Sequence, residues 1–546
     1  MTETFTYTDL FAGIGGFHAA LSGMGGQCTY AVEIDKDAAR VYEQNWGVGA
    51  LGDITVDAGE HGVSERIQPH DILAAGFPCQ PFSKSGAQAG MLDEVRGTLY
   101  FNILKIVQER HPTVLLLENV RNLAGPRHAH EWEVIVKSLR EEGYRVATTP
   151  AILSPHQLGP ERGGRPQVRE RVFITATYDP NGIESTEPQP VARPRELYAD
   201  GPVDWQIDDY LLADVEGYDL SDAEKDWIYA WDDWVQRFRH HNPGKKLPGF
   251  PIWVDAWQTI EDLEIQIESG ELDDVPAWKM NFLRKNAQLF TDNAAWCRAW
   301  KTTSGVKNFP PSRRKLEWQA QDIEALWDCL MHFRPSGLRA KPPTYVPALV
   351  AITQTSIVGK KRRRLAPREA ARLQGFPDEF SFAGQPDAKT YKQLGNGVNV
   401  GVVWNVLRMH CERDRRILER VPGPPGRHRH PGRQAQGSAR GHQGDSPQRG
   451  LTPRRVRRVP GRRAYPRPDY AGFRLGHSPH SRDAERGGHR QAVHDGPDGH
   501  PHHRRSGQRR ARPHELGWAY HPHRRGLFPC FPGPGLVLAG LVFPHH

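Results

Sequence analysis

The sequence predicts an α/β protein: a doubly wound, Rossmann-like sheet with a smaller inserted domain and a disordered C-terminal tail. Short apolar runs alternate with helical patterns over residues 1–178, which is typical of a mostly parallel sheet covered by helices. The pattern breaks off over 179–345 and returns over 346–420. We therefore expect the chain to leave the first domain, form a second one and re-enter the first. A chain of 546 residues has room for both.

Each element of the first domain follows from the spacing of its apolar residues. Four short apolar runs bounded by Gly, Pro or polar residues are expected to be buried strands: 6–13, 28–35, 71–77 and 113–120. Four segments with apolar residues at i, i+3 and i+4 are expected to be helices: 17–25, 36–46, 98–110 and 130–143. Ligands of such sheets bind at the carboxyl ends of the strands, so candidate site residues are sought there.

The inserted segment 179–345 is rich in tryptophan. It holds eleven of the fifteen tryptophans, and Trp227, Trp231 and Trp234 follow one another at i, i+4 and i+7. This spacing places them on one face of a helix. We predict a core stripe; the alternative is a platform on which nucleic-acid bases stack.

The last segment, 421–546, differs in composition from the rest of the chain. It carries 23 arginines, no lysine and seven acids, whereas 1–420 has a net charge of −8. Such a composition buries too little apolar surface to offset its ordering entropy, so we expect disorder. Our favoured explanation is out-of-frame translation of GC-rich DNA, and the alternative is a tail that binds DNA without sequence preference.

Several protein classes are disfavoured. The six cysteines form no CxxC pair, which argues against a disulfide scaffold and a structural zinc site and fits a reducing cytoplasm. The N-terminus lacks a secretory signal, and no run of about 18 apolar residues predicts a membrane span.

A glycine-rich turn follows the first predicted strand, within 9–21. Glycines let the backbone approach a ligand, and the next helix offers free N–H groups. Glu33 ends the second apolar run, where an acid accepts hydrogen bonds from ribose hydroxyls; the alternative is a solvated strand end. Asp53 is expected to close the third strand and to hold an adenine amino group. Because no phosphate-binding lysine motif is present, a nucleoside without phosphates such as S-adenosylmethionine fits better.

Cys79 lies in a turn that follows another predicted strand. An isolated cysteine is usually a buried structural residue. Here Pro78 and Pro81 flank the thiol, and a segment rich in small residues follows at 83–97. We therefore predict a nucleophile at the sheet edge with a loop that closes over it.

Two further strands bring charged residues to the same edge. Glu118 ends a strongly apolar strand, and burial there raises the pKa of a carboxyl group, which can then hold a proton at neutral pH. A strand over 167–173 is expected to place Gln167, Arg169, Arg171 and Phe173 on one face. The two arginines suggest an anionic or carbonyl-rich ligand; the alternative is a solvated basic edge.

Six motifs together resemble one family. FAGIGG, GFPCQPFS, ENV, QVRERVF, RLAPREAARLQGFP and QLGNGVNV occur in the order found in DNA (cytosine-5)-methyltransferases of the bacterial modification type. The resemblance covers 1–178 and 334–410, and it implies a Rossmann-like, S-adenosylmethionine-dependent methyltransferase sheet with an inserted target-recognition domain. The sequence departs from the family at 160–165, which lengthens the loop before the arginine strand.

The resemblance also implies roles for individual residues. Cys79 would be the nucleophile, Glu118 would contact cytosine N3 and the amino group, and Arg169 and Arg171 would hold the base from its O2 side. No metal is expected. The residues implied to bind S-adenosylmethionine are Phe11, Ala12, Gly13, Gly15, Gly16, Glu33, Ile34, Asp53, Ile54, Gly76, Pro78 and Asn396.

The implied partner is double-stranded DNA, read by the inserted region. Phosphate contacts are expected from 245–246, 313–315 and 360–364; the alternative for each cluster is an ordinary solvated face. We further expect a monomeric, cytoplasmic, nucleoid-associated enzyme with a cognate restriction endonuclease as its functional partner. Two alternatives stay open: methylation of a tRNA cytosine, which the long inserted domain disfavours, and a catalytically silent DNA-binding protein, which the intact motifs disfavour.

Overall fold

The computed structural model describes residues 5–78, 98–192, 203–349 and 355–420, and the backbone of two short paired strands, β18 (Val537–Leu538) and β19 (Leu541–Val542). Cys79 and the predicted closing loop at 83–97 lie outside the described residues, as does the tail apart from those two strands.

The first domain is built on a seven-stranded sheet of order β2-β1-β5-β6-β10-β7, with β8 paired to β10. The first four strands are parallel, and β10 runs antiparallel to β6. The strands are β1 (Phe5–Leu10), β2 (Gly26–Val32), β5 (Ile72–Gly76), β6 (Val114–Val120), β7 (Tyr144–Val146), β8 (Ala151–Leu153) and β10 (Arg171–Tyr178). The predicted α/β class is confirmed.

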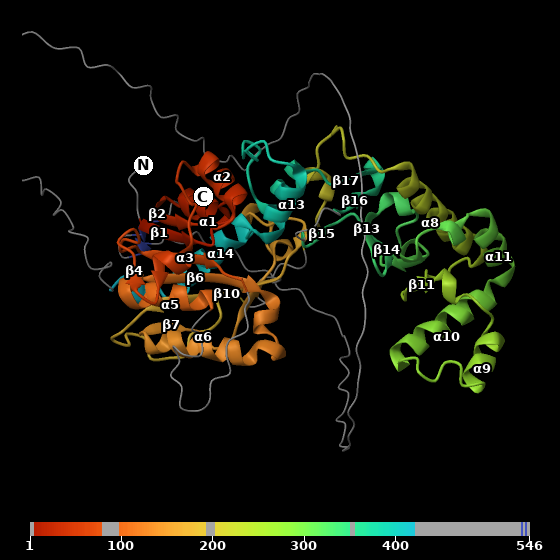
Figure 1. Cartoon of the computed structure of the whole chain (residues 1–546), viewed down its shortest axis with the longest axis horizontal. Helices are drawn as coiled ribbons and strands as arrows, with labels where there is room; N and C mark the ends of the chain where they lie inside the picture. The colour runs from red at the N-terminus through yellow and green to blue at the C-terminus, as the bar shows by residue number, and fades with distance from the viewer. Residues whose placement is uncertain are drawn as a thin grey trace, which may run out of the picture. The chain divides into compact units, whose positions relative to one another are not determined.

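Both faces of this sheet are buried, as its near-continuous apolar strands require. Within β6, Leu115 and Leu117 belong to one hydrophobic cluster, and Val114 and Leu116 belong to another. The first cluster includes side chains of α5 and α6, and the second includes side chains of α1 and α14 (Figure 1). The helices of this domain are α1 (Gly16–Gly23), α2 (Lys36–Trp46), α3 (Ile54–Asp57), α5 (Leu99–Arg110), α6 (Ala129–Glu141), α12 (Pro367–Gln374), α13 (Asp387–Asn396), α14 (Val400–Arg413) and α15 (Arg415–Leu418).

One expected strand is absent from this sheet. Asp53 does not close a third strand: Glu33 and Leu51 form only an isolated parallel bridge, and Asp53 is the N-cap of the short helix α3. The side chain of Asp53 accepts a hydrogen bond from the Thr55 N–H at 2.9 Å. Capping therefore decides the backbone here, since an aspartate before a helix satisfies a free N–H group. Two short hairpin strands follow, β3 (Ala58–Gly59) and β4 (Gly62–Val63).

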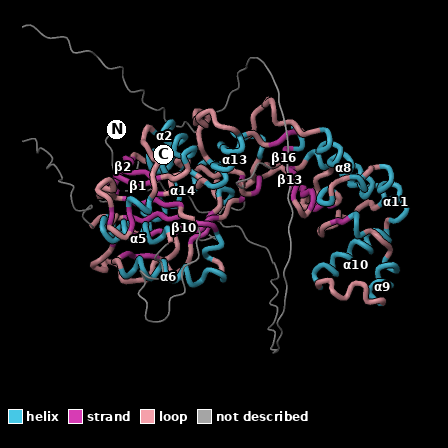
Figure 2. Tube along the Cα trace, viewed as in Figure 1, coloured by secondary structure: helices cyan, strands magenta, loops and turns pink. Residues whose placement is uncertain are grey.

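A second sheet carries the inserted domain, in the order β11-β12-β14-β13-β16-β17. Its strands are β11 (Ile252–Trp253), β12 (Lys315–Trp318), β13 (Leu330–Arg334), β14 (Gly337–Lys341), β16 (Ile357–Val358) and β17 (Arg363–Arg364). The helices beside it in Figure 2 are α8 (Asp222–His241), α9 (Ile260–Glu268), α10 (Ala277–Asp292) and α11 (Ala294–Thr303). Because β16 and β17 complete this sheet, it extends past the boundary expected at residue 345.

The tryptophan stripe lies in the core of the inserted domain, as predicted. Trp231 and Trp234 on α8 are fully buried, and Trp227 packs against the same cluster. The helix begins with a capping box in which Ser221 and Glu224 exchange hydrogen bonds with each other's backbone. Neither fully buried ring is free to stack on a base.

A buried ion network fastens the C-terminal return of the chain to the first sheet. Asp414 follows α14, has a fully buried side chain and accepts a hydrogen bond from Thr177 Oγ1 at 2.7 Å. Arg413 lies 2.7 Å and Arg145 3.5 Å from its carboxylate. Burial alone would raise the pKa of Asp414, but His410, Arg413 and Thr177 lower it to about 2. The carboxylate therefore stabilises the fold above its ordinary pKa of 3.8, and this contribution is lost as the pH falls toward 2.

We expect Asp414→Asn to lower the free energy of unfolding by about 3 kcal/mol at neutral pH, because two half-buried guanidinium groups lose their carboxylate. The difference from the native protein should narrow as the pH falls from 3.8 toward 2. Denaturant unfolding at several pH values measures both effects. Asp233→Asn, which removes an exposed ion pair with Arg237, is the control and should change stability by less than about 0.5 kcal/mol.

Candidate active site

The glycine-rich turn after β1 forms the first wall of the site. Phe11, Gly13 and Gly15 all have positive φ angles, of 55°, 55° and 91°, and α1 begins directly afterwards at Gly16. A Cβ atom on Gly15 would lie 2.1 Å from Trp46 Nε1, whereas one on Gly13 would meet nothing within 4 Å. The turn is thus packed against the protein at Gly15 and presents open backbone at Gly13.

Glu33 lies against this turn from the next strand. One carboxylate oxygen accepts a hydrogen bond from the Gly13 N–H at 2.8 Å, and the other accepts one from the Asp35 N–H at 2.7 Å. The neighbouring Ile34 is 70% exposed, although it is a large apolar residue. The Gly52 N–H donates to the Glu33 carbonyl, which brings the segment that ends at Asp53 beside it.

These features fit the adenosyl part of S-adenosylmethionine. Open backbone at Gly13 admits a ligand close to the chain, Glu33 supplies oxygens for ribose hydroxyls, and Ile34 offers apolar surface to an adenine ring. Ile54 is buried and packs in the hydrophobic cluster that contains Leu10 and Val32.

The second wall is the carboxyl end of β5 and β6. Glu118 on β6 pairs in register with Gly76, the last residue of β5. A Cβ atom on Gly76 would lie 3.5 Å from Glu118 Oε2, in van der Waals contact with that carboxyl group. Pro78 is exposed and is the last described residue before Cys79. The chain that leads to Cys79 therefore leaves the sheet next to Glu118.

Glu118 and Arg171 form an ion pair at this edge. Arg171 Nε lies 3.0 Å from Glu118 Oε1, and the two side chains are 18% and 10% exposed. Burial raises the pKa of Glu118, while Arg171 and Arg169 lower it; the pKa stays above its ordinary value. The group can thus retain a proton at a higher pH than a free glutamate.

Arg169 is placed differently from the expectation. The predicted strand is interrupted, because β9 (Gln167–Val168) ends before Arg169 and β10 begins at Arg171. The Arg169 guanidinium is buried and donates hydrogen bonds to the carbonyls of Leu349 (3.1 Å), Gly395 (2.8 Å) and Gly397 (2.6 Å). Burial and the neighbouring Arg171 lower its pKa to about 9. Arg169 therefore holds the C-terminal end of α13, whose last residue is the exposed Asn396.

Asn119 is a site residue that the sequence analysis did not single out. Its side-chain amide donates a hydrogen bond to the Phe77 carbonyl at 2.9 Å, and its Oδ1 accepts one from the Val120 N–H at 2.8 Å. The side chain is buried and fixes the turn that leads to Cys79. The available signal was its place directly after Glu118 at a strand end, where alternation turns it to the opposite face of the sheet.

The additional residues 160–165 pack away from this edge. The Asn405 amide donates to the Arg162 carbonyl at 2.6 Å, and Arg165 Nε donates to the Arg372 carbonyl at 3.0 Å. A Cβ atom on Gly401 would lie 2.0 Å from the Gly163 carbonyl oxygen. The longer loop is thus fitted against α12 and α14. The short strand β15 (Val346–Pro347) pairs with β9 after this loop.

Most of the lysines and arginines expected to contact phosphate are engaged within the protein. Lys245, Lys246 and Lys360 are exposed. In contrast, Arg363 is buried and pairs with Glu369 at 2.6 Å, and Arg314 pairs with Asp255 at 3.3 Å. Clusters in the sequence were therefore a poor guide to free positive charge.

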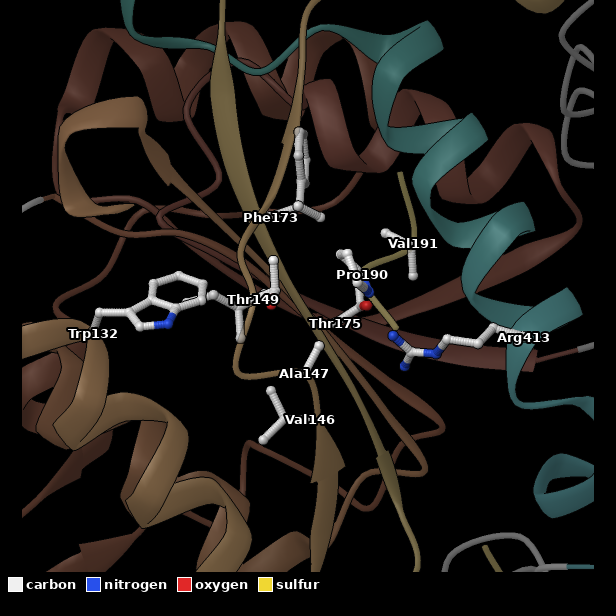
Figure 3. Close-up of a pocket in the computed structure, with 11 residues that line it drawn as sticks. Trp132, Val146, Ala147, Thr149, Phe173, Thr175, Pro190, Val191 and Arg413 are labelled. Atoms are coloured by element: carbon white, nitrogen blue, oxygen red, sulfur yellow. The ribbon is translucent and has the colours of Figure 1, made fainter. Parts of the chain in front are cut away.

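Figure 3 shows a small pocket at another place in the first domain, lined by residues of α6, β7, β8, β10 and α14 and of the loops beside them. Trp132 and Arg413 lie on opposite sides of it. Of the residues expected to bind the cofactor or the base, none lines this pocket.

The fold and this sheet edge together define a class of protein, the Rossmann-like methyltransferases that bind S-adenosylmethionine at a glycine-rich turn. The chain belongs to the C-5 cytosine-specific DNA methylase family, whose model matches residues 5–412. It is therefore a DNA cytosine-5 methyltransferase with S-adenosylmethionine as its methyl donor, which confirms the expected enzyme class and cofactor.

Curated relatives agree with this assignment. The chain is 48% identical over 492 residues to Type II methyltransferase M.AluI of Cellulosimicrobium cellulans, covering 77% of this chain and 94% of the relative. It is 38% identical to M.HpaII of Haemophilus parainfluenzae (74% and 88% covered) and 38% identical to M.HhaI of Haemophilus parahaemolyticus (73% and 91% covered). No described helix is long and apolar enough to cross a membrane.

Proposed function

We propose that the chain methylates C5 of a cytosine that is flipped out of a specific duplex DNA site, through a covalent bond between Cys79 and cytosine C6. The observation that carries this mechanism is the buried pair of Glu118 and Arg171, which lies beside Gly76 where the chain turns toward Cys79. Target atoms inside a duplex are out of reach of such an edge, so the base must leave the stack.

Cytosine C5 is a poor nucleophile, and the protein has to activate it. Addition of the Cys79 thiolate to C6 pushes electrons toward N3, where the protonated Glu118 carboxyl group supplies a proton. Arg171 stabilises the charge that develops at O2. S-adenosylmethionine supplies the methyl group when bound. Water then takes the proton from C5 as the C6–S bond breaks and releases the Cys79 thiolate. The Glu118 carboxylate takes back the proton on N3, which restores the aromatic ring.

The geometry of the site supports the other proposed roles. The Gly13 backbone, Glu33 and Ile34 hold the cofactor, and Asp53, Pro78 and Asn396 complete its pocket. Asn119 and Arg169 are positioning residues, since they fix backbone on either side of the Glu118–Arg171 pair. We also propose that the enzyme is the modification component of a restriction–modification system, as the Type II names of its relatives suggest. We further propose that it acts as a monomer.

Methyl transfer from labelled S-adenosylmethionine tests the proposal. We expect incorporation into duplex DNA and none into tRNA, with C5-methylcytosine confined to one short sequence when DNA from expressing cells is sequenced. The same DNA should resist a Type II endonuclease that cuts at that sequence. Transfer to tRNA alone, or methylcytosine without any sequence preference, would contradict the proposal.

A further inference from the structure

The two faces of the second sheet differ sharply in chemistry. Strand partners share a face, and the face that carries Met331, Phe333 and Leu338 packs into the cluster around Trp231 and Trp234. The opposite face carries His332 and Arg334 from β13, Arg339 and Lys341 from β14, and Lys315 and Glu317 from β12.

This second face is positively charged in a chain whose first 420 residues are net acidic. Arg339 is held by Glu317, with Nε 2.6 Å from its Oε2. Arg334 and Lys341 form no ion pair with a carboxylate among the described residues. Together with Lys315, four cations thus share this face with one anion, and a protein has to stabilise such a cluster with an external anion or tolerate the repulsion.

The cations are crowded and partly desolvated. Arg334, Arg339 and Lys341 are all half-buried. Burial lowers the pKa of Lys341, and Arg339 and Arg334 lower it further. His332 does not add charge: burial lowers its pKa to about 3, and its Nε2 lies 2.6 Å from Ser356 Oγ. Its neutral ring therefore fills the centre of the face.

The position of the face connects it to the catalytic domain. Leu330, the partner of both Lys341 and Val358, lies on this same face. Leu330 and Val358 pack in one hydrophobic cluster with Ala370 and Leu373 of α12. The cationic surface therefore begins where the second sheet meets the return segment of the first domain. At the end of this face away from Leu330, Arg334 pairs with Gly337, which has no side chain to cover the Arg334 guanidinium.

We propose that this cationic face binds the phosphodiester backbone of the substrate duplex, with Arg334 and Lys341 as phosphate ligands and Arg339 positioned by Glu317. The inference rests on the proposed function and adds the surface that holds the DNA. Arginine and lysine contacts to phosphate set affinity and register without reading sequence. DNA phosphates would supply the anions that the protein itself lacks here.

The test compares the full-length native protein with an Arg334→Ala/Lys341→Ala double variant in binding to a duplex at several salt concentrations. We expect a loss of roughly 10- to 100-fold in affinity and a decrease of about 2 in the slope of log affinity against log salt. The Michaelis constant for DNA should rise while kcat at saturating DNA stays unchanged. Glu317→Gln should act in the opposite direction and strengthen binding a few-fold, because it removes the single anion of this face.

A Lys225→Ala/Arg237→Ala variant is the matched control, because it removes two cations of α8 that already pair with Asp222 and Asp233. The arginine-rich tail is common to all variants, so its contribution cancels. Unchanged unfolding midpoints and S-adenosylmethionine affinities will show that the variants are folded. A native-like affinity and slope in the double variant, or an equal loss in the control, would overturn the inference. Failure of the proposed function is distinct, because the native protein itself would then not methylate DNA.

Discussion

Replacement of Cys79 by alanine is expected to abolish methyl transfer, with a loss on the order of 10⁴-fold or more, because removing the nucleophile of a covalent mechanism removes the whole pathway. Duplex DNA and S-adenosylmethionine should still bind, since neither depends on the sulfur. Radiolabel transfer at saturating substrates measures the loss. The native protein should also form a covalent band with duplexes that contain 5-fluorocytosine, because fluorine at C5 blocks the release step.

The four other cysteines in the described part of the chain provide the control. Burial raises the pKa of Cys28, Cys297 and Cys329 to about 12, and that of Cys411 well above its ordinary value. These thiols stay protonated at neutral pH and are poor nucleophiles. Cys28→Ala should therefore keep both activity and the covalent band. A covalent band of native intensity in Cys79→Ala would contradict the mechanism. Full methyl transfer by that variant would contradict it too.

Glu118→Gln is expected to lower kcat by about 10²- to 10³-fold, because glutamine has the same shape and cannot transfer a proton to N3. Duplex binding should be little affected. The neighbouring Glu170→Gln, at an exposed pair with Arg121, should leave kcat within about twofold of native and serves as the matched control. Native activity in Glu118→Gln would show that the proton comes from elsewhere.

The pH dependence of kcat is a second test of Glu118 as the proton donor. Because the protonated form of Glu118 acts, kcat should fall as the pH rises through its elevated pKa. Arg171 lowers that pKa. Removing this cation with Arg171→Ala should therefore reduce kcat and move the alkaline limb to higher pH. If the alkaline limb of the kcat profile stays at the same pH or moves to lower pH, a group other than Glu118 determines it.

Much of the site could be predicted because its residues follow local patterns. Gly13, Gly15 and Gly16 occupy a strand-to-helix turn that demands positive φ angles or close approach, and Glu118 ends a run of apolar residues on a buried strand. Such features depend on neighbours within a few positions. The fold class followed for the same reason, since strand and helix periods are written in consecutive residues.

The contacts of Arg169 could not be predicted from local sequence patterns. A period of two placed it on one face with Arg171, and the family resemblance implied a base-binding role. Its hydrogen-bond partners are instead carbonyls 180 to 228 residues further along the chain. These carbonyls become its partners only when the return segment packs onto the sheet. Long-range backbone contacts of this kind leave no spacing in the sequence.

By itself, the sequence determined the alternation of strands and helices, the turn that receives the cofactor and the carboxyl group at the strand end, because each is fixed by residues close together in the chain. Only the tertiary structure decided which charges are free. Adjacent cations such as Arg313 and Arg314 turned inward to backbone carbonyls, whereas Arg334 and Lys341, isolated in the sequence, came together on one sheet face. Hydrogen bonding and the register between strands determine which of these cations are free. Both exist only in the folded chain.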